Sequence, residues 1–234
     1  MHFRRWGSLF AALWLAQGVV CSQVPPAEEI YSRFGVGKPG EPIAEFAGGK
    51  FAMADDEVVV FIGQENLVRE QKSGVMESML ASGFAAYKPR FRFMAWEADT
   101  VYEQWREVNF GDWPAQLHVA RATMLVVQFG QMESLDGRGR LTEFATAYHR
   151  LLDEFAQRTR RVVLLSPLPF ESPQASHAPD LPSCDADVYA YMKAIREIAV
   201  QRGAVFVDLY SPFVDSSDSR VAERLTENGI HLTE

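Results

Sequence analysis

The chain has 234 residues, of which 47% are hydrophobic and 23% charged, enough to bury a core in one domain or in one domain with small attachments. Its formal net charge of −8 argues against a nucleic-acid partner, because such a partner needs a basic surface. An acidic surface favours solubility and carries no information about the fold.

The first 22 residues predict a signal peptide. "MHFRRW" supplies positive charge, and "GSLFAALWLAQGVV" is an apolar run of signal-peptide length that is short for a membrane span. Val20 and Ser22 are small and suit cleavage after Ser22, which predicts export to the periplasm or beyond. Cys21 raises the alternative of a lipoprotein signal peptide, although Val20 fits poorly just before a lipid-modified cysteine. A leader that stays uncleaved as a membrane anchor is a further alternative. Cleavage leaves Cys184 as the one cysteine, so no intramolecular disulfide is expected.

Residues 23–50 are rich in Pro and Gly and predict a linker or an N-terminal arm, followed by one domain over residues 51–234. From Glu57 onwards, apolar runs alternate with amphipathic stretches. The apolar runs predict strands at 58–62, 91–95, 123–129, 161–165 and 204–209. The amphipathic stretches predict helices at 67–80, 114–121, 141–158 and 187–202. This alternation predicts an α/β fold with a mainly parallel sheet of about five strands covered on both faces.

In a parallel sheet, functional residues gather where the strands end. Short motifs occur at these ends. "GQE" (63–65) follows the first strand, "MAWEADTV" (94–101) the second and "GQM" (130–132) the third, while "NGIH" (228–231) stands near the C-terminus. In order and spacing over residues 57–231, these motifs resemble those of the SGNH hydrolases, also called GDSL-type esterases. The longer segments "WEADTVYEQWREVNFGDW" and "FGQMESLDG" resemble those of a divergent branch of this superfamily in planctomycete and verrucomicrobial genomes.

The resemblance implies a flavodoxin-like three-layer α/β/α fold, and hydrolysis of carbohydrate, acyl or lipid esters by Ser, His and Asp. It places Gly63 at the first motif's glycine and Glu65 at the nucleophile Ser. It further places Ala98 at the backbone donor that binds the oxyanion, and the motif Gly130-Gln131-Met132 at the family's Gly-x-Asn. The family's Asp-x-x-His corresponds to Asn228 and His231, with Glu227 as a substitute carboxylate. The family usually continues with a helix after this His, so the resemblance implies either a chain truncated at its C-terminus or a site without its last wall.

Three of the four defining side chains are therefore changed, and several roles for Glu65 stay open. It can act as a nucleophile or base on a glycosidic bond, with Glu97 or Glu133 as partner acid. It can instead cap the helix that follows it. Ser134 and Ser166 at other strand ends are weaker nucleophile candidates, although neither stands in a sharp turn.

Of the remaining histidines, His118 and His149 fall in expected helices and His177 in a Pro-rich loop. Their scatter shows no metal-ligand spacing, so neither a metal nor a cofactor is expected. Five aromatic residues fall in one expected connection, where they can pack on the sheet edge or form a sugar-stacking surface; they are Trp96, Tyr102, Trp105, Phe110 and Trp113.

The sequence thus predicts an exported SGNH-like protein that acts on carbohydrate or acyl esters through an atypical site. The alternative is a catalytically inactive module that binds a glycan or another small ligand. Neither a nucleic-acid partner nor a membrane span after signal removal is expected, and the sequence leaves the oligomeric state open.

Overall fold

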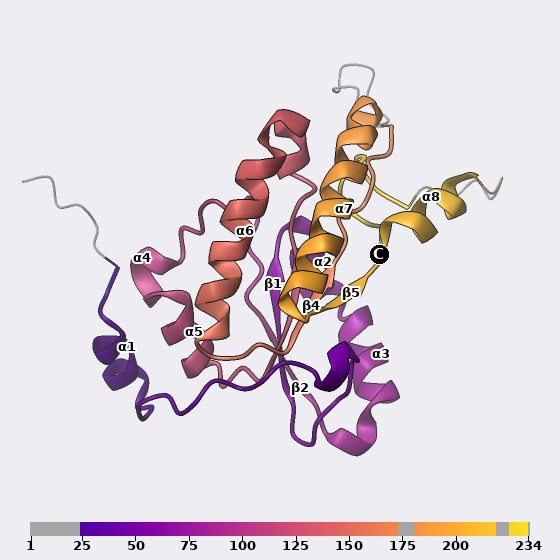
Figure 1. Ribbon diagram of the computed structural model, residues 1–234. Coiled ribbons are helices and arrows are strands. Elements are labelled where there is room, and N and C mark those ends of the chain that lie inside the picture. Colours follow the sequence, from indigo (N-terminus) through magenta and orange to yellow (C-terminus); the bar gives the residue numbers. More distant parts are fainter. Residues whose placement is uncertain (1–23, 173–180, 219–224, 234) are drawn as a thin grey trace, which may run out of the picture.

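A computed structural model describes residues 24–172, 181–218 and 225–233. Its centre is a five-stranded sheet in the order β2-β1-β3-β4-β5, in which every neighbouring pair is parallel (Figure 1). The strands are β1 (Val58–Gly63), β2 (Arg90–Phe93), β3 (Met124–Gln128), β4 (Val162–Leu165) and β5 (Val205–Val207). The predicted parallel sheet of about five strands is confirmed.

The inner strands β1, β3 and β4 are buried at every position, as expected for strands covered on both faces. The edge strand β2 instead reads "RFRF", with exposed Arg alternating with half-buried Phe. Its two Phe rings stack on Phe61 of β1, with ring centroids 6.2 Å away for Phe91 and 4.7 Å for Phe93. These contacts bury one face of the edge strand and leave its charged face in water.

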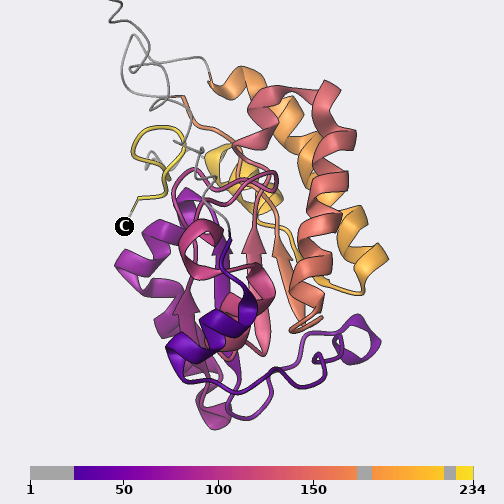
Figure 2. The same cartoon turned by 90° about the vertical axis from the view of Figure 1, so that its left-hand side faces the viewer.

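Helices cover both faces of the sheet, which completes the predicted three layers (Figure 2). On one face lie α5 (Trp113–Val119), α6 (Leu141–Ala156) and α7 (Asp185–Arg202). On the other lie α2 (Glu65–Ser73) and α3 (Val75–Gly83). The remaining α-helices of the described residues are α1 (Ala27–Phe34), α4 (Glu107–Phe110) and α8 (Tyr210–Asp218).

The single helix expected over residues 67–80 is wrong, because the structure has two helices there. Gly74 adopts the left-handed conformation, with φ of 66°, and ends α2 by donating its backbone N–H to the carbonyl of Glu70. The second helix, α3, then starts at Val75. The other expected strands and helices are present, with ends that differ by a few residues.

Residues 24–50 are mostly exposed and contact the rest of the chain at a few points. Ile30 of α1 is fully buried beside α5, and Phe46 is buried in the apolar cluster on the opposite face. Between them, Ile43 exchanges backbone hydrogen bonds with Arg158 and Arg160 just before β4. None of the described helices is both long and apolar enough to span a membrane.

Candidate active site

The end of β1 is fixed by close contact with its neighbour β3. A Cβ on Gly63 would lie 2.3 Å from the carbonyl oxygen of Gln128, so only glycine fits here. The carbonyl of Gly63 accepts a hydrogen bond from the backbone N–H of Trp96, at 3.0 Å, in the segment that follows β2. The start of α2 is thereby placed beside the segment that contains Ala98 and Asp99.

Glu65 is the first residue of α2, and its carboxylate contacts that segment. Glu65 Oε1 accepts a hydrogen bond from the backbone N–H of Ala98 at 3.2 Å, and Ala98 has a left-handed φ of 66°. Glu65 Oε2 is buried and has no hydrogen-bond partner among the described residues. The helix-capping alternative is wrong, because the N-cap of α2 is Gln64 and no side chain there caps the helix. The backbone donor that the family resemblance assigns to an oxyanion is therefore occupied by the protein's own carboxylate.

A second carboxylate, which was not predicted from the sequence, lies next to this contact. Asp99 is only 3% exposed, and its Oδ2 is buried without a partner in the described part of the chain. Burial raises the pKa of Asp99 to about 6, the nearby Arg106 opposes the rise, and the charge of Glu65 adds to it. Two acidic groups therefore share a poorly hydrated region at the end of β2.

Glu133 ties three strand ends together. Its carboxylate accepts hydrogen bonds from the backbone N–H of Gly130 at 2.8 Å, the backbone N–H of Val101 at 2.9 Å and Gln64 Nε2 at 2.9 Å. Burial raises the pKa of Glu133, and these three donors oppose the rise. Because Glu133 is 2% exposed and fully engaged, it cannot serve as the accessible partner acid expected for Glu65. Glu97, the other expected partner, is exposed.

The amide of Gln131 is also committed to the protein. Its Nε2 donates to the carbonyl of Leu168 at 3.0 Å, and its Oε1 accepts from Asn66 Nδ2 at 3.3 Å. Gln131 is 5% exposed, so its amide does not replace the oxyanion donor that the family has at the position of Met132. Asn66 Oδ1 in turn accepts the backbone N–H of Leu232 at 3.3 Å, which ties the segment containing His231 to the start of α2.

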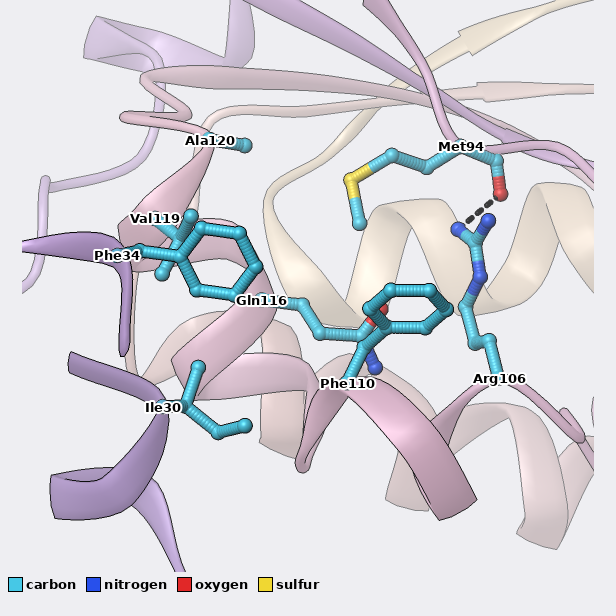
Figure 3. A pocket seen from close by; sticks show the side chains of 8 residues that line it. All are labelled: Ile30, Phe34, Met94, Arg106, Phe110, Gln116, Val119 and Ala120. Carbon is cyan, nitrogen blue, oxygen red and sulfur yellow. Dashed lines mark hydrogen bonds between the residues drawn. The ribbon is translucent and has the colours of Figure 1, made fainter. Parts of the chain in front are cut away.

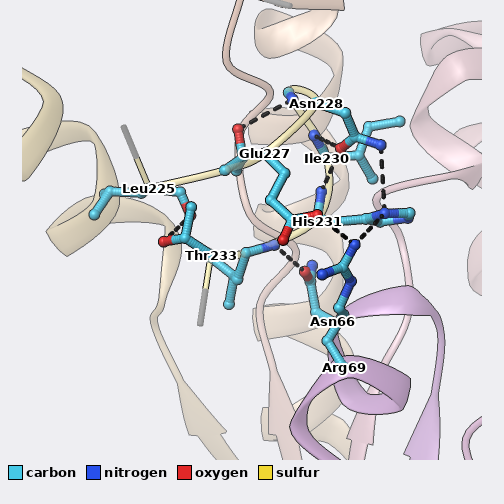
Figure 4. A network of polar contacts seen from close by, with 11 residues as sticks. Asn66, Arg69, Leu225, Glu227, Asn228, Ile230, His231 and Thr233 are labelled. Atoms are coloured by element: carbon cyan, nitrogen blue, oxygen red, sulfur yellow. Dashed lines mark hydrogen bonds and ion pairs between the residues drawn. The ribbon is translucent and has the colours of Figure 1, made fainter. Parts of the chain in front are cut away.

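The ring of His231 faces two hydrogen-bond donors (Figure 4). Asn228 Oδ1 accepts the backbone N–H groups of Ile230 and His231, at 3.1 and 2.9 Å, which orients the amide. Asn228 Nδ2 therefore faces His231 Nδ1 at 3.3 Å, and Arg69 Nη2 approaches the same atom at 3.4 Å. Amide and guanidinium nitrogens only donate, so Nδ1 accepts and the proton of the neutral ring is on Nε2.

Glu227 binds Arg69 and does not contact the histidine ring. Its carboxylate forms an ion pair with Arg69 Nη2 at 2.6 Å, and this hydrogen bond holds the pKa of Glu227 below its usual value. The expectation that Glu227 substitutes for the aspartate is therefore wrong in this geometry. Arg69 was missed at the sequence level because nothing in α2 itself indicates a partner that is 158 positions away.

The other candidate nucleophiles and bases lie away from this region or inside the protein. Ser134 and Ser166 are both fully buried. Ser134 Oγ donates to the carbonyl of Gln131 at 2.6 Å, while Ser166 Oγ accepts two backbone N–H groups. His118 bonds the carbonyl of Gly37, His149 bonds Arg202, and His177 lies outside the described residues. The described residues contain no cluster of three or more side chains able to hold a metal.

No family model and no curated protein matches this sequence, whereas solved structures do match its fold. The acetylxylan esterase Axe2 from Geobacillus stearothermophilus superposes with a TM-score of 0.59 at 14% identity, over 78% of this chain and 90% of the esterase. A GDSL-like lipase from Parabacteroides merdae gives a TM-score of 0.59 at 20% identity, over 79% of this chain and 91% of the lipase. The chain has an SGNH hydrolase-like fold.

A third match to this SGNH-like fold is BT4096, a gut microbial diltiazem-metabolizing enzyme. It gives a TM-score of 0.62 at 16% identity over 79% of this chain, which spans 45% of that enzyme's length. Catalytic mutants of Axe2 replace a serine, an aspartate or a histidine by alanine, and that aspartate stands three positions before the histidine.

The fold therefore places Glu65 in hydrogen-bond contact with Ala98, and Asn66 in hydrogen-bond contact with Gln131. It also brings Asn228 and Arg69 to His231. Glu227 is held apart from the ring, and Glu133 and Gln131 are engaged within the protein. Asn66, Arg69 and Asp99 were not predicted from the sequence, although Asn66 follows Glu65 and Asp99 follows Ala98.

Proposed function

We propose that this chain is a ligand-binding module with an SGNH-like fold whose site does not perform serine-type ester hydrolysis. The observation that carries the proposal is the hydrogen bond from Ala98 N–H to the Glu65 carboxylate, at 3.2 Å. Ester hydrolysis needs such a donor free for the negative charge that develops on the carbonyl oxygen. Here a carboxylate already holds the donor, and its charge repels an oxyanion in the same place.

The state of His231 supports the same proposal. In the serine route, a carboxylate accepts the Nδ1–H of the histidine, which leaves a lone pair on Nε2 to take the serine's proton. Asn228 and Arg69 both donate toward Nδ1, so the neutral ring has its proton on Nε2 and no free base there. With Glu65 at the nucleophile position, neither the nucleophile nor its base is available.

The ligand we propose is a glycan. Trp96 and Trp105 are 47% and 70% exposed. Trp96 lies in the segment after β2 and is held beside the end of β1 by its backbone hydrogen bond to Gly63. Exposed indole rings offer flat apolar faces with a polar edge, which suits the mixed surface of a sugar ring. The acetylxylan esterase with a similar fold is named for a carbohydrate ester, which supports the same ligand class. We also propose that the chain is exported, on the basis of its N-terminal leader.

Hydrolysis of carbohydrate or acyl esters is the second candidate function. One observation favours it: Asn228 and His231 have the three-residue spacing of the aspartate and histidine replaced in the catalytic mutants of Axe2. Ester hydrolysis at this site would require the Glu65 carboxylate to leave the Ala98 N–H, and the His231 ring to reorient, when a substrate binds.

The test is to measure hydrolysis and binding on the same preparations. Hydrolysis of p-nitrophenyl acetate and acetylated xylo-oligosaccharides is measured for the wild type, Glu65→Ala and His231→Ala. We expect no rate above the uncatalysed reaction for any of them. Catalytic hydrolysis by the wild type that is lost in both variants would establish the second candidate.

Xylo-oligosaccharide binding is then measured by isothermal titration calorimetry. We expect the wild type and Met79→Ala to bind alike, since Met79 is exposed on α3, and Trp96→Ala and Trp105→Ala to bind more weakly. The absence of binding in the wild type would refute the glycan ligand. Equal binding by all four proteins would refute the assignment of the two tryptophans.

A further inference from the structure

An apolar pocket lies between α1, α4 and α5, on the side of the sheet opposite α2 and α3 (Figure 3). Its volume is about 220 Å³, which suits a short acyl chain or one aromatic ring more than a drug-sized ligand. Its apolar lining includes Ile30 and Phe34 from α1, Phe110 from α4, Val119 from α5, and Met94 after β2. None of these residues takes part in the contacts of Glu65 or His231.

Arg106 supplies a positive charge to the lining of this pocket. Its guanidinium lies between two indole rings, 5.4 Å from the Trp96 centroid and 5.5 Å from that of Trp113. It donates one hydrogen bond to the carbonyl of Met94, whereas its Nε is buried and has no partner among the described residues. Asp99 attracts it, yet within the described part of the chain no carboxylate lies within 4.0 Å of it.

A half-buried guanidinium with no carboxylate at ion-pair distance is unusual, because burial removes part of the water that otherwise solvates the charge. The cation–π contacts stabilise the charge and leave Nε without a hydrogen-bond partner among the described residues. Phe34 and Phe110 add a second anomaly, since these two lining rings stay 48% and 44% exposed. A ligand with a negative head and an apolar body would satisfy both features.

We propose that this pocket binds a small amphiphilic carboxylate, with its carboxylate paired to Arg106 and its apolar part against Phe34, Phe110 and Met94. A neutral apolar ligand would fill the pocket but leave the Arg106 charge unpaired, and a cation would be repelled by it. A carboxylate also matches the planar donor geometry of a guanidinium. The pocket adjoins the proposed glycan site, because the Arg106 guanidinium lies against the ring of Trp96. The proposal rests on Arg106 and the apolar lining and does not require the glycan proposal to hold.

The test uses sodium octanoate and octan-1-ol, which share a chain length and differ in charge. Binding of each is measured by isothermal titration calorimetry to the wild type, Arg106→Met, Phe34→Ala and the control Val200→Ala, at an exposed position on α7. We expect the wild type to bind one octanoate about tenfold more tightly than octanol, the effect of one charge-assisted hydrogen bond pair. Arg106→Met should bind both alike, Phe34→Ala should bind both more weakly, and Val200→Ala should match the wild type.

Equal affinity of the wild type for octanoate and octanol would overturn the proposal, as would unchanged octanoate binding by Arg106→Met. No octanoate binding at millimolar concentration would overturn it too. Arg106 packs between two tryptophans, so circular dichroism checks the fold of each variant. If Arg106→Met does not fold, the wild-type comparison decides alone, and Arg106→Lys, which keeps the charge, is expected to retain a preference for octanoate. Phe34→Ala leaves Arg106, Trp96 and Trp105 in place. Xylo-oligosaccharide titration of Phe34→Ala therefore separates failure here from failure of the glycan proposal.

Discussion

Replacing Asp99 by Asn is expected to stabilise the protein at neutral pH. Asp99 is 3% exposed, its Oδ2 has no partner in the described part of the chain, and burial raises its pKa from 3.8 to about 6. Between these two pKa values the folded protein binds more protons than the unfolded chain. The free energy of unfolding therefore falls as the pH rises from about 4 to 6. Above about pH 6 the whole destabilisation by the buried Asp99 charge is present.

The size of the effect follows from the pKa shift. About 2 pKa units at about 1.4 kcal/mol each give about 3 kcal/mol as an upper bound. Because the effective dielectric constant of a protein interior is well above that of dry protein, we expect a smaller gain of about 1–2 kcal/mol. An asparagine of nearly the same shape carries no charge, so Asp99→Asn should recover this amount at pH 7.5. For a chain of this size, that corresponds to a melting temperature about 2–8 °C higher.

The assay is urea unfolding followed by circular dichroism at pH 4.5 and 7.5, for the wild type, Asp99→Asn and Asp55→Asn. Asp55 is exposed in a turn before β1 and serves as the matched control. We expect Asp99→Asn to gain stability at pH 7.5, and most of that gain to disappear at pH 4.5, where folded Asp99 is already protonated. The control should follow the wild type. Equal or lower stability of Asp99→Asn at pH 7.5 would refute the reasoning.

Three other predictions concern the same edge of the sheet. Gly63→Ala is expected to lose about 3 kcal/mol or more, because its Cβ would meet the Gln128 carbonyl at 2.3 Å; a urea midpoint equal to the wild type would contradict this. Ala98→Gly is expected to gain about 0.5 kcal/mol in the same measurement, since relief of left-handed strain exceeds the added chain entropy, and a loss would count against it. Nitrogen-15 spectra of His231 should show the neutral ring protonated at Nε2, and protonated at Nδ1 in Asn228→Asp; an Nδ1 proton in the wild type would exclude the assignment.

Local sequence pattern was sufficient to predict the fold. Continuous β-branched and apolar runs such as 58–62 and 123–129 can be buried on both faces only in a covered sheet, and the amphipathic stretches between them supply the cover. The one helix that was predicted wrongly, over 67–80, shows the limit of periodicity. The apolar residues on either side of Gly74 keep nearly helical spacing. Gly74 nevertheless ends α2, because its left-handed conformation turns the chain.

The sequence by itself determined which chemical groups stand at the strand ends: a Glu where the SGNH motif that it resembles has a serine, Met132 in place of an Asn, and Asn228 in place of the Asp before His231. Only the tertiary structure decided what those groups do. Glu65 meets Ala98 across 33 positions, Gln131 meets Asn66 across 65, and Arg69 meets Glu227 across 158. These pairings depend on how parallel strands bring separate loops to one edge. Once the loops have packed, each backbone or side-chain donor left without a partner pairs with the nearest acceptor, as the Ala98 N–H does with the Glu65 carboxylate.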